Sequence, residues 1–573
     1  MRSKLLAIAA VCMGMITGCA ITPPLEPVEV AAHPDLAEHS SEFTKQVLTV
    51  TDGVHLAIGF GLANSILLEG DDGVIIVDTL ESAEAAIPVK KEFTRITSKP
   101  VKAIIYTHFH SDHTFGARIM AGDDNPDVYS HASTVAHLDR IVNITRDITY
   151  KRAMRMFGTL LPEGGLVNDG IGPFLAYDKD STVALLRPTR TFKSEYMDLE
   201  IAGVSLRLIH APGETPDQIV VWLPDKKVLL CADDYYKSFP NLYTIRGTAY
   251  RDVLVWVKSL DMMRTLRPEI LVPGHTLPLY GADTIYETLT NYRDAIQFVH
   301  DQTIRHMNAG LTPDEIVELV KLPPHLASQP YLQEYYGTVE FSVRDIFDGY
   351  LGWFSGNATD LKPLSPAEEA LRFASLAGGR DNLLEHARHA VQTGDHQWAL
   401  VLTDHLIHLN DERTPEARSL RAAALNARAE QQISAPARNY YLTQALEVEN
   451  RIAIGTVPKS SNIDLVHSIP LEALFSAMAV SLDPEKSSEV DTIVGFRFPD
   501  TGEAYTVHVR RGVAEIQPTF PANPDNTLTV DSFVWKEITA GIRNPALALV
   551  SGDVAIDGGT LDLIRFLRLF GTD

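Results

Sequence analysis

Hydrophobic and polar positions alternate in short blocks along the first half of the chain. Short apolar runs bounded by Gly and Asp are typical of strands, and the first three predict consecutive antiparallel strands. The predicted strands are residues 56–60, 65–68, 74–77, 101–106, 204–209, 218–223 and 228–232. Residues 82–96 and 252–266 are predicted to form helices. Strands mixed with helices in this way predict a layered α/β sandwich.

The pattern changes twice further along the chain. From about residue 312 to residue 450 strand signals vanish, and apolar residues recur at helical spacing, which predicts stacked antiparallel helix pairs. From about residue 456 strand signals return. Residues 493–498 and 504–510 predict a hairpin, and residues 561–570 predict a closing amphipathic helix. This last part is predicted to be a small α+β domain.

Composition narrows the class of protein. A chain of 573 residues is too long for one hydrophobic core, so roughly two to four domains are expected. With 45% hydrophobic and 22% charged residues, the chain is typical of a globular protein. The net charge of -24 argues against nucleic acid as a partner, because phosphate binding needs a basic surface. Any site for an anion must therefore be built from local positive charge.

The first residues predict export. Arg2 and Lys4 precede an apolar stretch at residues 5–16 that is too short for a permanent membrane anchor. The sequence ITGC at residues 16–19 resembles a bacterial lipobox, which implies a lipidated Cys19; the alternative is a plain secretory signal cleaved near Ala20. We therefore expect a periplasmic protein or an outer-membrane-anchored lipoprotein of a Gram-negative-type bacterium. The following residues, rich in Pro and acidic side chains, predict a tether.

A dense group of metal-binding side chains follows the strand at residues 101–106. Residues 107–113 read THFHSDH, so His108, His110, Asp112 and His113 all project from one loop. Imidazoles and a carboxylate at this density are typical of a site for zinc or a similar divalent ion, with manganese and iron as alternatives. Close packing of four such side chains has little structural rationale without a metal.

This HxHxDH string resembles the signature of the metallo-β-lactamase superfamily. The resemblance implies an αββα sandwich in which the first two histidines serve one metal and the Asp-His pair serves a second. The remaining ligands of that superfamily follow later strands, and the matching positions here are Glu214, Asp233 and His275. His210 and Asp234 are competing candidates that stand out of register with the motif.

Several further features resemble the linear alkylsulfatases within that superfamily. Their third ligand is a glutamate, as at Glu214, and residues 241–247 (NLYTIRG) resemble the stretch in which Asn241 and Arg246 would hold the sulfate group. Residues 349–357 resemble part of a helical dimerisation domain, and the last hundred or so residues resemble a sterol-carrier-like domain thought to offer apolar binding surface. The implied divisions are a signal peptide with lipobox (1–19), a tether (20–45), a metallo-β-lactamase catalytic domain (46–300), a helical dimerisation domain (301–455) and a sterol-carrier-like domain (456–573).

Two departures from the alkylsulfatase pattern are visible. No second glutamate follows Pro216, and the bridging position carries Asp233 instead of Glu, which shortens its reach by one methylene. Both changes bear on substrate preference and turnover more than on the fold.

A formal charge count fits a sulfate monoester. Two divalent ions bring four positive charges, and Asp112, Glu214, Asp233 and a bridging hydroxide remove four. Arg246 then leaves a surplus of about one positive charge, the complement of a monoanion. Divalent metals lower the pKa of bound water from about 15.7 toward 7, which makes a metal-bound hydroxide the expected nucleophile. Arg246 and Asn241 would donate to the sulfate oxygens.

The resemblance therefore implies a homodimeric enzyme with two divalent metals per chain, most simply Zn²⁺, that hydrolyses surfactant-type alkyl sulfates such as dodecyl sulfate to alcohol and sulfate. Membrane contact is expected only through a lipid anchor at the N-terminus. Tyr243 and Tyr250 are candidate proton donors or packing residues. Which bond breaks, C–O or S–O, stays open.

Other interpretations use the same residues differently. A lactonase, thioesterase or β-lactamase would share the HxHxDH string, and a lipid-binding lipoprotein without turnover would keep the fold. Residues 434–438 (SAPAR) also resemble the signature of the formylglycine sulfatases, but Gln444 stands where that signature has Gly, and the segment lies in the helical region. We interpret that match as coincidence.

Overall fold

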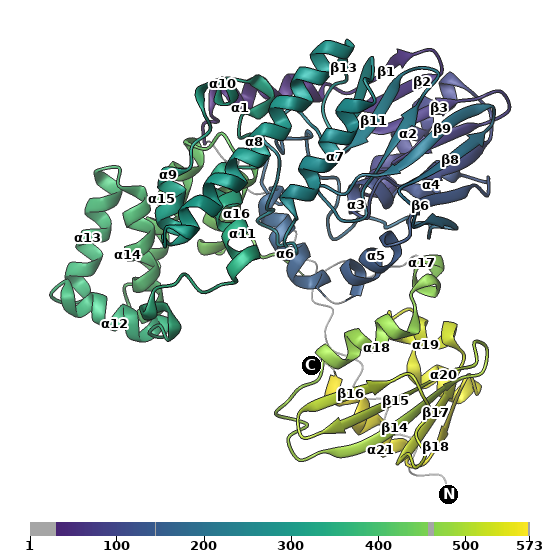
Figure 1. Ribbon diagram of the computed structural model, residues 1–573. Helices are drawn as coiled ribbons and strands as arrows, with labels where there is room; N and C mark the ends of the chain where they lie inside the picture. The colour runs from purple at the N-terminus through teal and green to yellow at the C-terminus, as the bar shows by residue number, and fades with distance from the viewer. Residues whose placement is uncertain (1–29, 144, 456–462, 571–573) are drawn as a thin grey trace, which may run out of the picture.

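The computed structural model describes residues 30–143, 145–455 and 463–570 (Figure 1). The signal peptide and lipobox predicted at residues 1–19 lie outside the described residues, so the predicted localisation stays a prediction. Among the described helices, none is both long enough and apolar enough to cross a membrane.

Two sheets form the middle of the predicted catalytic domain, called the catalytic half below, as the sequence predicts. The seven-stranded sheet runs in order through β1 (Gln46–Thr51), β2 (Val54–Ile58), β3 (Ser65–Glu69), β4 (Val74–Val77), β5 (Val101–Ile105), β6 (Asp127–His131) and β7 (Arg190–Phe192). The six-stranded sheet has the order β13 (Leu279–Tyr280), β12 (Ile270–Pro273), β11 (Val228–Ala232), β10 (Ile219–Leu223), β9 (Val204–His210) and β8 (Tyr196–Ile201). The pairs β2–β3 and β3–β4 are antiparallel, which confirms the predicted meander.

Burial on both faces explains the continuous apolar runs of the central strands. In β4, Ile75 and Val77 pack between the two sheets, while Val74 and Ile76 pack on the opposite face. Because side chains alternate between faces, a strand covered on both sides needs apolar residues at every position. The opposite face is covered by α2 (Ala83–Ile96) and by α4 (Ala117–Ala121). The α2 helix begins at its N-cap Ser82, whose hydroxyl accepts from Ala85 N.

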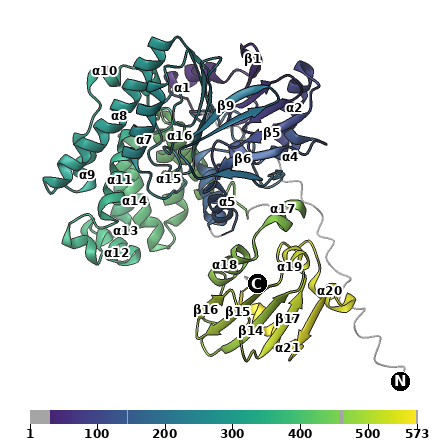
Figure 2. The same ribbon diagram turned by 45° about the vertical axis from the view of Figure 1, so that its right-hand side comes forward.

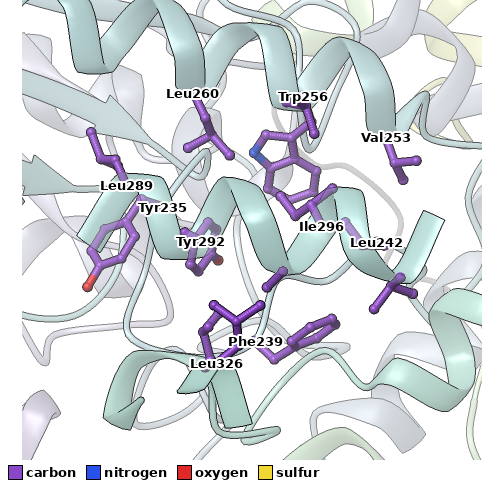
Figure 3. Packing of buried hydrophobic residues seen from close by; sticks show 14 of the residues in the cluster. Tyr235, Phe239, Leu242, Val253, Trp256, Leu260, Leu289, Tyr292, Ile296 and Leu326 are labelled. Carbon is purple, nitrogen blue, oxygen red and sulfur yellow. The ribbon is translucent and has the colours of Figure 1, made fainter. Parts of the chain in front are cut away.

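The second sheet is covered by α7 (Val253–Thr265) and α8 (Ala282–Asn308), which completes the αββα sandwich. Figure 3 shows Trp256 of α7 beside Ile296 of α8. Phe239 and Leu242, from the loop after β11, belong to the same cluster. This cluster extends into α9 (Pro313–Leu319), α10 (Pro324–Ala327) and α11 (Val339–Leu351). The predicted boundary at residues 300 and 301 therefore falls inside α8, and the first helices beyond it share a core with the catalytic sheets.

The remaining helices form a second helical core. They are α12 (Pro366–Leu376), α13 (Arg380–Gln392), α14 (His396–Leu409), α15 (Thr414–Glu430) and α16 (Ala435–Val448). The α16 helix also packs on α6 (Arg146–Met156) of the catalytic half, where Arg155 binds Glu447 with two hydrogen bonds of 2.8 and 3.0 Å. The helical region predicted from spacing is confirmed.

The C-terminal part is the predicted α+β domain. Its sheet has the order β16 (Val513–Gln517), β15 (Glu503–Arg510), β14 (Asp491–Phe498), β17 (Asn526–Val530) and β18 (Val554–Asp557). The hairpin of β14 and β15 lies where it was predicted. Its helices are α17 (Ile463–Ser468), α18 (Leu471–Val480), α19 (Ser532–Thr539), α20 (Pro545–Ser551) and α21 (Thr560–Leu567). In both views this domain lies beside α5 (Thr134–Asn143), and α18 contacts that helix (Figures 1 and 2).

The predicted tether is too long at its C-terminal end. Residues 34–43 fold as α1 (Pro34–His39) and a 3₁₀ turn (Ser40–Phe43) against the catalytic half. Leu36 and Phe43 are buried, and the ring of His39 stacks on Tyr335 with centroids 3.9 Å apart. The segment is also held by polar contacts, because Asn168 Nδ2 donates to Leu36 O at 2.8 Å and His39 Nε2 lies 2.9 Å from Gly170 O. Its acid-rich composition does not reveal these long-range contacts.

Candidate metal centre

All seven predicted metal ligands meet at one edge of the sandwich. His108 and His110 follow β5, and Asp112 and His113 lie on the short helix α3 (Ser111–Thr114). The later residues, Glu214, Asp233 and His275, follow β9, β11 and β12. The strand pairs β4–β5 and β11–β12 are parallel, so the ends of strands from both sheets meet here. Each of the seven side chains is buried.

The first group contains His108, His110, Glu214 and Asp233. Their ligand atoms all lie within 4.8 Å of one another. His110 Nδ1 is 2.8 Å from His108 Nε2 and 3.5 Å from Glu214 Oε2. Such a cluster of imidazole nitrogens and carboxylate oxygens is a donor set that suits a divalent cation.

The second group contains Asp112, His113 and His275. Asp112 Oδ2 is 3.4 Å from His113 Nε2 and 3.6 Å from His275 Nε2. Asp233 Oδ2 borders both groups, at 3.5 Å from His113 Nε2, 3.2 Å from His275 Nε2 and 3.7 Å from His108 Nε2. The geometry therefore places one carboxylate between two sets of ligands, as a bridging position requires.

The outward nitrogens of three histidines are held by hydrogen bonds. His113 Nδ1 is 2.7 Å from Asp78 Oδ2, His275 Nδ1 is 2.9 Å from Leu62 O, and His108 Nδ1 is 3.1 Å from Thr107 Oγ1. Each contact orients the ring so that Nε2 faces the other ligands. The sequence interpretation missed Asp78; its signal is an acidic residue directly after a fully buried strand.

The charges at the site also fit cations. Burial alone would raise the pKa of Asp233, but the imidazoles of His275, His113 and His108 hold this pKa well below its usual value. Among the described residues, His113 Nε2 and Asp233 Oδ1 are buried without a hydrogen-bond partner. Buried polar atoms are nearly always satisfied, and metal coordination would satisfy His113 Nε2.

The competing candidates lie outside both groups. The ring of His210 stacks on His131 with centroids 3.9 Å apart, and its Nε2 lies 3.0 Å from Pro216 O. Asp234 is buried next to the site, where burial and the negative charges of Asp233 and Glu214 raise its pKa well above the usual value. Neither ligand group includes Asp234, which favours Asp233 over its neighbour.

Of the two predicted sulfate-binding residues, Arg246 borders the centre. Arg246 Nη2 lies 3.0 Å from His110 Nε2. Asn241 is 3% exposed, and within the described chain its side-chain Nδ2 has no hydrogen-bond partner. A second arginine, Arg251, was missed by the sequence interpretation; its Nη1 donates to Glu214 Oε1 at 2.8 Å.

A cavity of about 550 Å³ extends from the metal centre to the C-terminal domain. Its polar end includes His110, Asp112, Glu214, Asp233, Arg246 and His275. Its apolar walls come from Phe115, Tyr150 and Phe157 of the catalytic half and from Leu474, Phe475, Met478 and Trp535 of the C-terminal domain. Asn241, Tyr243 and Tyr250 are not among the lining residues, whereas Tyr336 is. The ring of Tyr250 instead packs near Tyr350.

Ser434, in the segment that resembles the formylglycine sulfatase signature, has a structural role. It is 2% exposed and is the N-cap of α16, where its hydroxyl accepts from Ala437 N. Neither metal group includes any residue of this segment.

The fold and the two ligand groups define a protein of the metallo-β-lactamase superfamily. Residues 58–275 match the family described as metallo-beta-lactamase superfamily, residues 312–451 match alkyl sulfatase dimerisation, and residues 459–572 match alkyl sulfatase C-terminal.

Known proteins are similar to this chain along most of their length. The linear primary-alkylsulfatase of Pseudomonas sp. (strain ATCC 19151) is 39% identical over 88% of this chain and 98% of its own. An alkyl/aryl-sulfatase of Saccharomyces cerevisiae is 29% identical over 91% of this chain and 82% of its own. The solved structure of a stereoselective inverting sec-alkylsulfatase from Pseudomonas sp. matches 95% of this chain and 88% of its own, with a TM-score of 0.87 and 27% identity. The chain belongs to the alkylsulfatase family of the metallo-β-lactamase superfamily.

The shared carboxylate gives a direct test of the centre. Replacing Asp233 by Asn removes the negative charge between both groups and keeps the side-chain shape. We expect metal affinity to fall by at least about 10-fold, since even the loss of a hydrogen-bond partner of a ligand costs that much. Elemental analysis after dialysis against a graded chelator measures the change. The matched control is Asp234→Asn, which should retain its metal; equal affinities in the two variants would contradict the assignment.

Proposed function

We propose that the protein hydrolyses alkyl sulfate esters to an alcohol and inorganic sulfate. The observation that carries this proposal is the combination of Arg246 and a metal-type ligand cluster at the polar end of one long apolar cavity. An alkyl sulfate has the same two-part chemistry, with one compact anion joined to an apolar tail. The names of the relatives, which include primary and secondary alkylsulfatases, agree with this substrate class.

Two divalent ions per chain, most simply Zn²⁺, fit the donor set. His108, His110 and Glu214 would hold the first ion, and Asp112, His113 and His275 the second, with Asp233 shared. When bound, such ions lower the pKa of water enough to give a nucleophile at neutral pH. Asp78 keeps the His113 ring in the orientation in which Nε2 faces inward.

Arg246 and Asn241 would bind the sulfate group. Arg246 presents a planar set of donors at the cavity wall, which matches paired anionic oxygens. Asn241 contributes an amide whose Nδ2 is still unpaired within the described residues. In the formal charge count, Arg251 and Asp78 add one charge of each sign and cancel, so the surplus near the anion stays at about one positive charge.

The apolar part of the cavity would take the alkyl tail. Its volume of about 550 Å³ is in the range of cavities that enclose small organic ligands. Phe475 and Met478 of α18 face the catalytic half across this space. Burial of methylene groups here would stabilise the complex by about 0.8 kcal/mol for each group.

A homodimer is the proposed assembly. Large apolar side chains are exposed close together in sequence at the end of α11 and beyond it, within the region that matches alkyl sulfatase dimerisation. They are Tyr350, Leu351, Trp353, Leu361, Leu364, Leu371 and Leu376. A surface that a second chain covers would explain so many exposed apolar side chains in one region.

The anion-binding role is tested by Arg246→Ala. We expect kcat/KM for dodecyl sulfate to fall by about 100-fold or more, because a donor to developing negative charge is lost, while metal content stays unchanged. Hydrolysis of alkyl sulfates, a lactone and nitrocefin is measured side by side, with Arg207→Ala, an exposed arginine, as control. Loss of metal in the variant, or an unmodified enzyme more active on the lactone or nitrocefin, would contradict the proposal.

Tail binding is tested on α18. Met478→Trp fills the apolar part of the cavity, so KM for dodecyl sulfate should rise by about 10-fold or more while KM for a short-chain alkyl sulfate changes little. Val480→Trp on the same helix is the control, because Val480 is 66% exposed. An equal effect of Met478→Trp on long and short substrates would place the tail elsewhere.

The dimer is tested by Trp353→Glu, since Trp353 is 72% exposed within the apolar cluster. Light scattering after size exclusion should give the mass of two chains for the unmodified protein and of one chain for the variant. Val550→Glu, at an exposed position of the C-terminal domain, should leave the dimer intact. A variant that stays dimeric, or an unmodified monomer, would argue against this interface.

A further inference from the structure

Arg251 is the buried cation whose place the proposed chemistry leaves unexplained. It follows the proposed sulfate-binding stretch and directly precedes Asp252, the N-cap of α7. Its side chain is 3% exposed, and its guanidinium does not line the cavity. A fully buried arginine is costly unless it is paired, so its partners show what it does.

One nitrogen of Arg251 joins two parts of the site. Nη1 donates to Glu214 Oε1 at 2.8 Å and also to the backbone oxygen of Asn241. Glu214 is left with Oε2 facing His110 Nδ1 at 3.5 Å and His108 Nε2 at 4.0 Å. The hydrogen bond to Oε1 therefore sets the rotation of this carboxylate and directs its other oxygen to the first ligand group.

The same contact fixes the backbone of Asn241. Its carbonyl accepts from Arg251, and its N–H donates to the Tyr236 hydroxyl at 2.8 Å. With both backbone groups held, the position from which the Asn241 side chain projects is fixed. Preorganised donors lose less entropy on binding an anion than mobile donors do.

A buried acidic group of the helical region lies close enough to feel the charge of Arg251. Asp345 of α11 is buried, and burial raises its pKa to about 7 while the charge of Arg251 opposes that shift. Burial alone would lower the pKa of Arg251, but the charge of Glu214 and the hydroxyl groups of Tyr236 and Tyr336 raise it. Within the described chain, Nε and Nη2 of Arg251 have no hydrogen-bond partner, so the two contacts from Nη1 carry its role.

We propose that Arg251 is a positioning residue that holds the metal-facing carboxylate of Glu214 and the backbone of Asn241, the proposed sulfate-binding residue, in one arrangement, so that metal affinity and sulfate affinity depend on the same side chain. The inference rests on the proposed function, because Asn241 is taken as an anion ligand. It makes Arg251 different from Arg246, which touches the cavity itself.

The test uses the full-length protein and two ligands, the metal ion and inorganic sulfate. Arg251→Met keeps an unbranched apolar stem but removes the guanidinium and its donors. We expect its metal affinity, measured against a graded chelator without substrate, to fall by about 10- to 100-fold. The inhibition constant of inorganic sulfate, measured at saturating metal, should rise by about 10-fold or more. Unchanged values of either constant in the folded variant would overturn the proposal.

Arg251→Lys keeps the proposal testable if the methionine variant does not fold. An ammonium group carries three donors and can supply both hydrogen bonds from one nitrogen, so both constants should stay within about threefold of the unmodified protein. A large fall in metal affinity, or a large rise in the inhibition constant of sulfate, in a folded lysine variant would contradict the proposal. It would show that two hydrogen bonds from one nitrogen do not account for the role of Arg251.

Arg293→Met is the matched control, because Arg293 is half-buried and paired with Asp261 and Asp294. It should change neither constant; if it weakened both as Arg251→Met does, the effect would be one of general stability. Both readouts are independent of turnover on alkyl sulfates. Metal and sulfate binding without alkylsulfatase activity would therefore count against the proposed function and leave the role of Arg251 standing.

Discussion

The active half of the molecule depends on one buried carboxylate among imidazoles. Asp233 lies within 3.7 Å of His108, His113 and His275, which come from two different loops. Such a group is stable only if its charge is matched, because isolated charges in a protein interior cost several kcal/mol. The strands of the two sheets bring these loops to one edge. The fold therefore holds together carboxylate and imidazole groups that would stay solvated in the unfolded chain.

From this centre the site changes from charged to apolar over the length of one cavity. The first part is lined by metal-type ligands and Arg246, and the last part by Leu474, Phe475 and Trp535 of the C-terminal domain. Neither domain encloses the cavity alone. This change from charged to apolar lining matches an amphiphilic ester. The compact anion would lie beside the guanidinium, and the methylene groups would lie where the side chains carry no charge.

Much of this arrangement could be predicted from the sequence, for physical reasons that differ by element. The HxHxDH string needs no long-range information, because its four side chains share one loop after β5. Glu214, Asp233 and His275 were placed by resemblance, and the structure brings them together with that loop.

Asp78 and Arg251 were missed because each is a single residue without a spacing pattern, and their partners are 35 and 37 positions away. The N-terminal helix was missed because its acid-rich composition does not reveal the long-range contacts that hold it. The division at residue 300 differs from the structure because α8 passes through it to join a core shared with the sheets.

The account depends on where the cations lie, and anomalous X-ray diffraction at the metal absorption edge measures that directly. We expect two peaks per chain, one within bonding distance of His108, His110 and Glu214 and the other of Asp112, His113 and His275, with an oxygen of Asp233 reaching both. A single peak, or peaks bound by other side chains, would contradict the account.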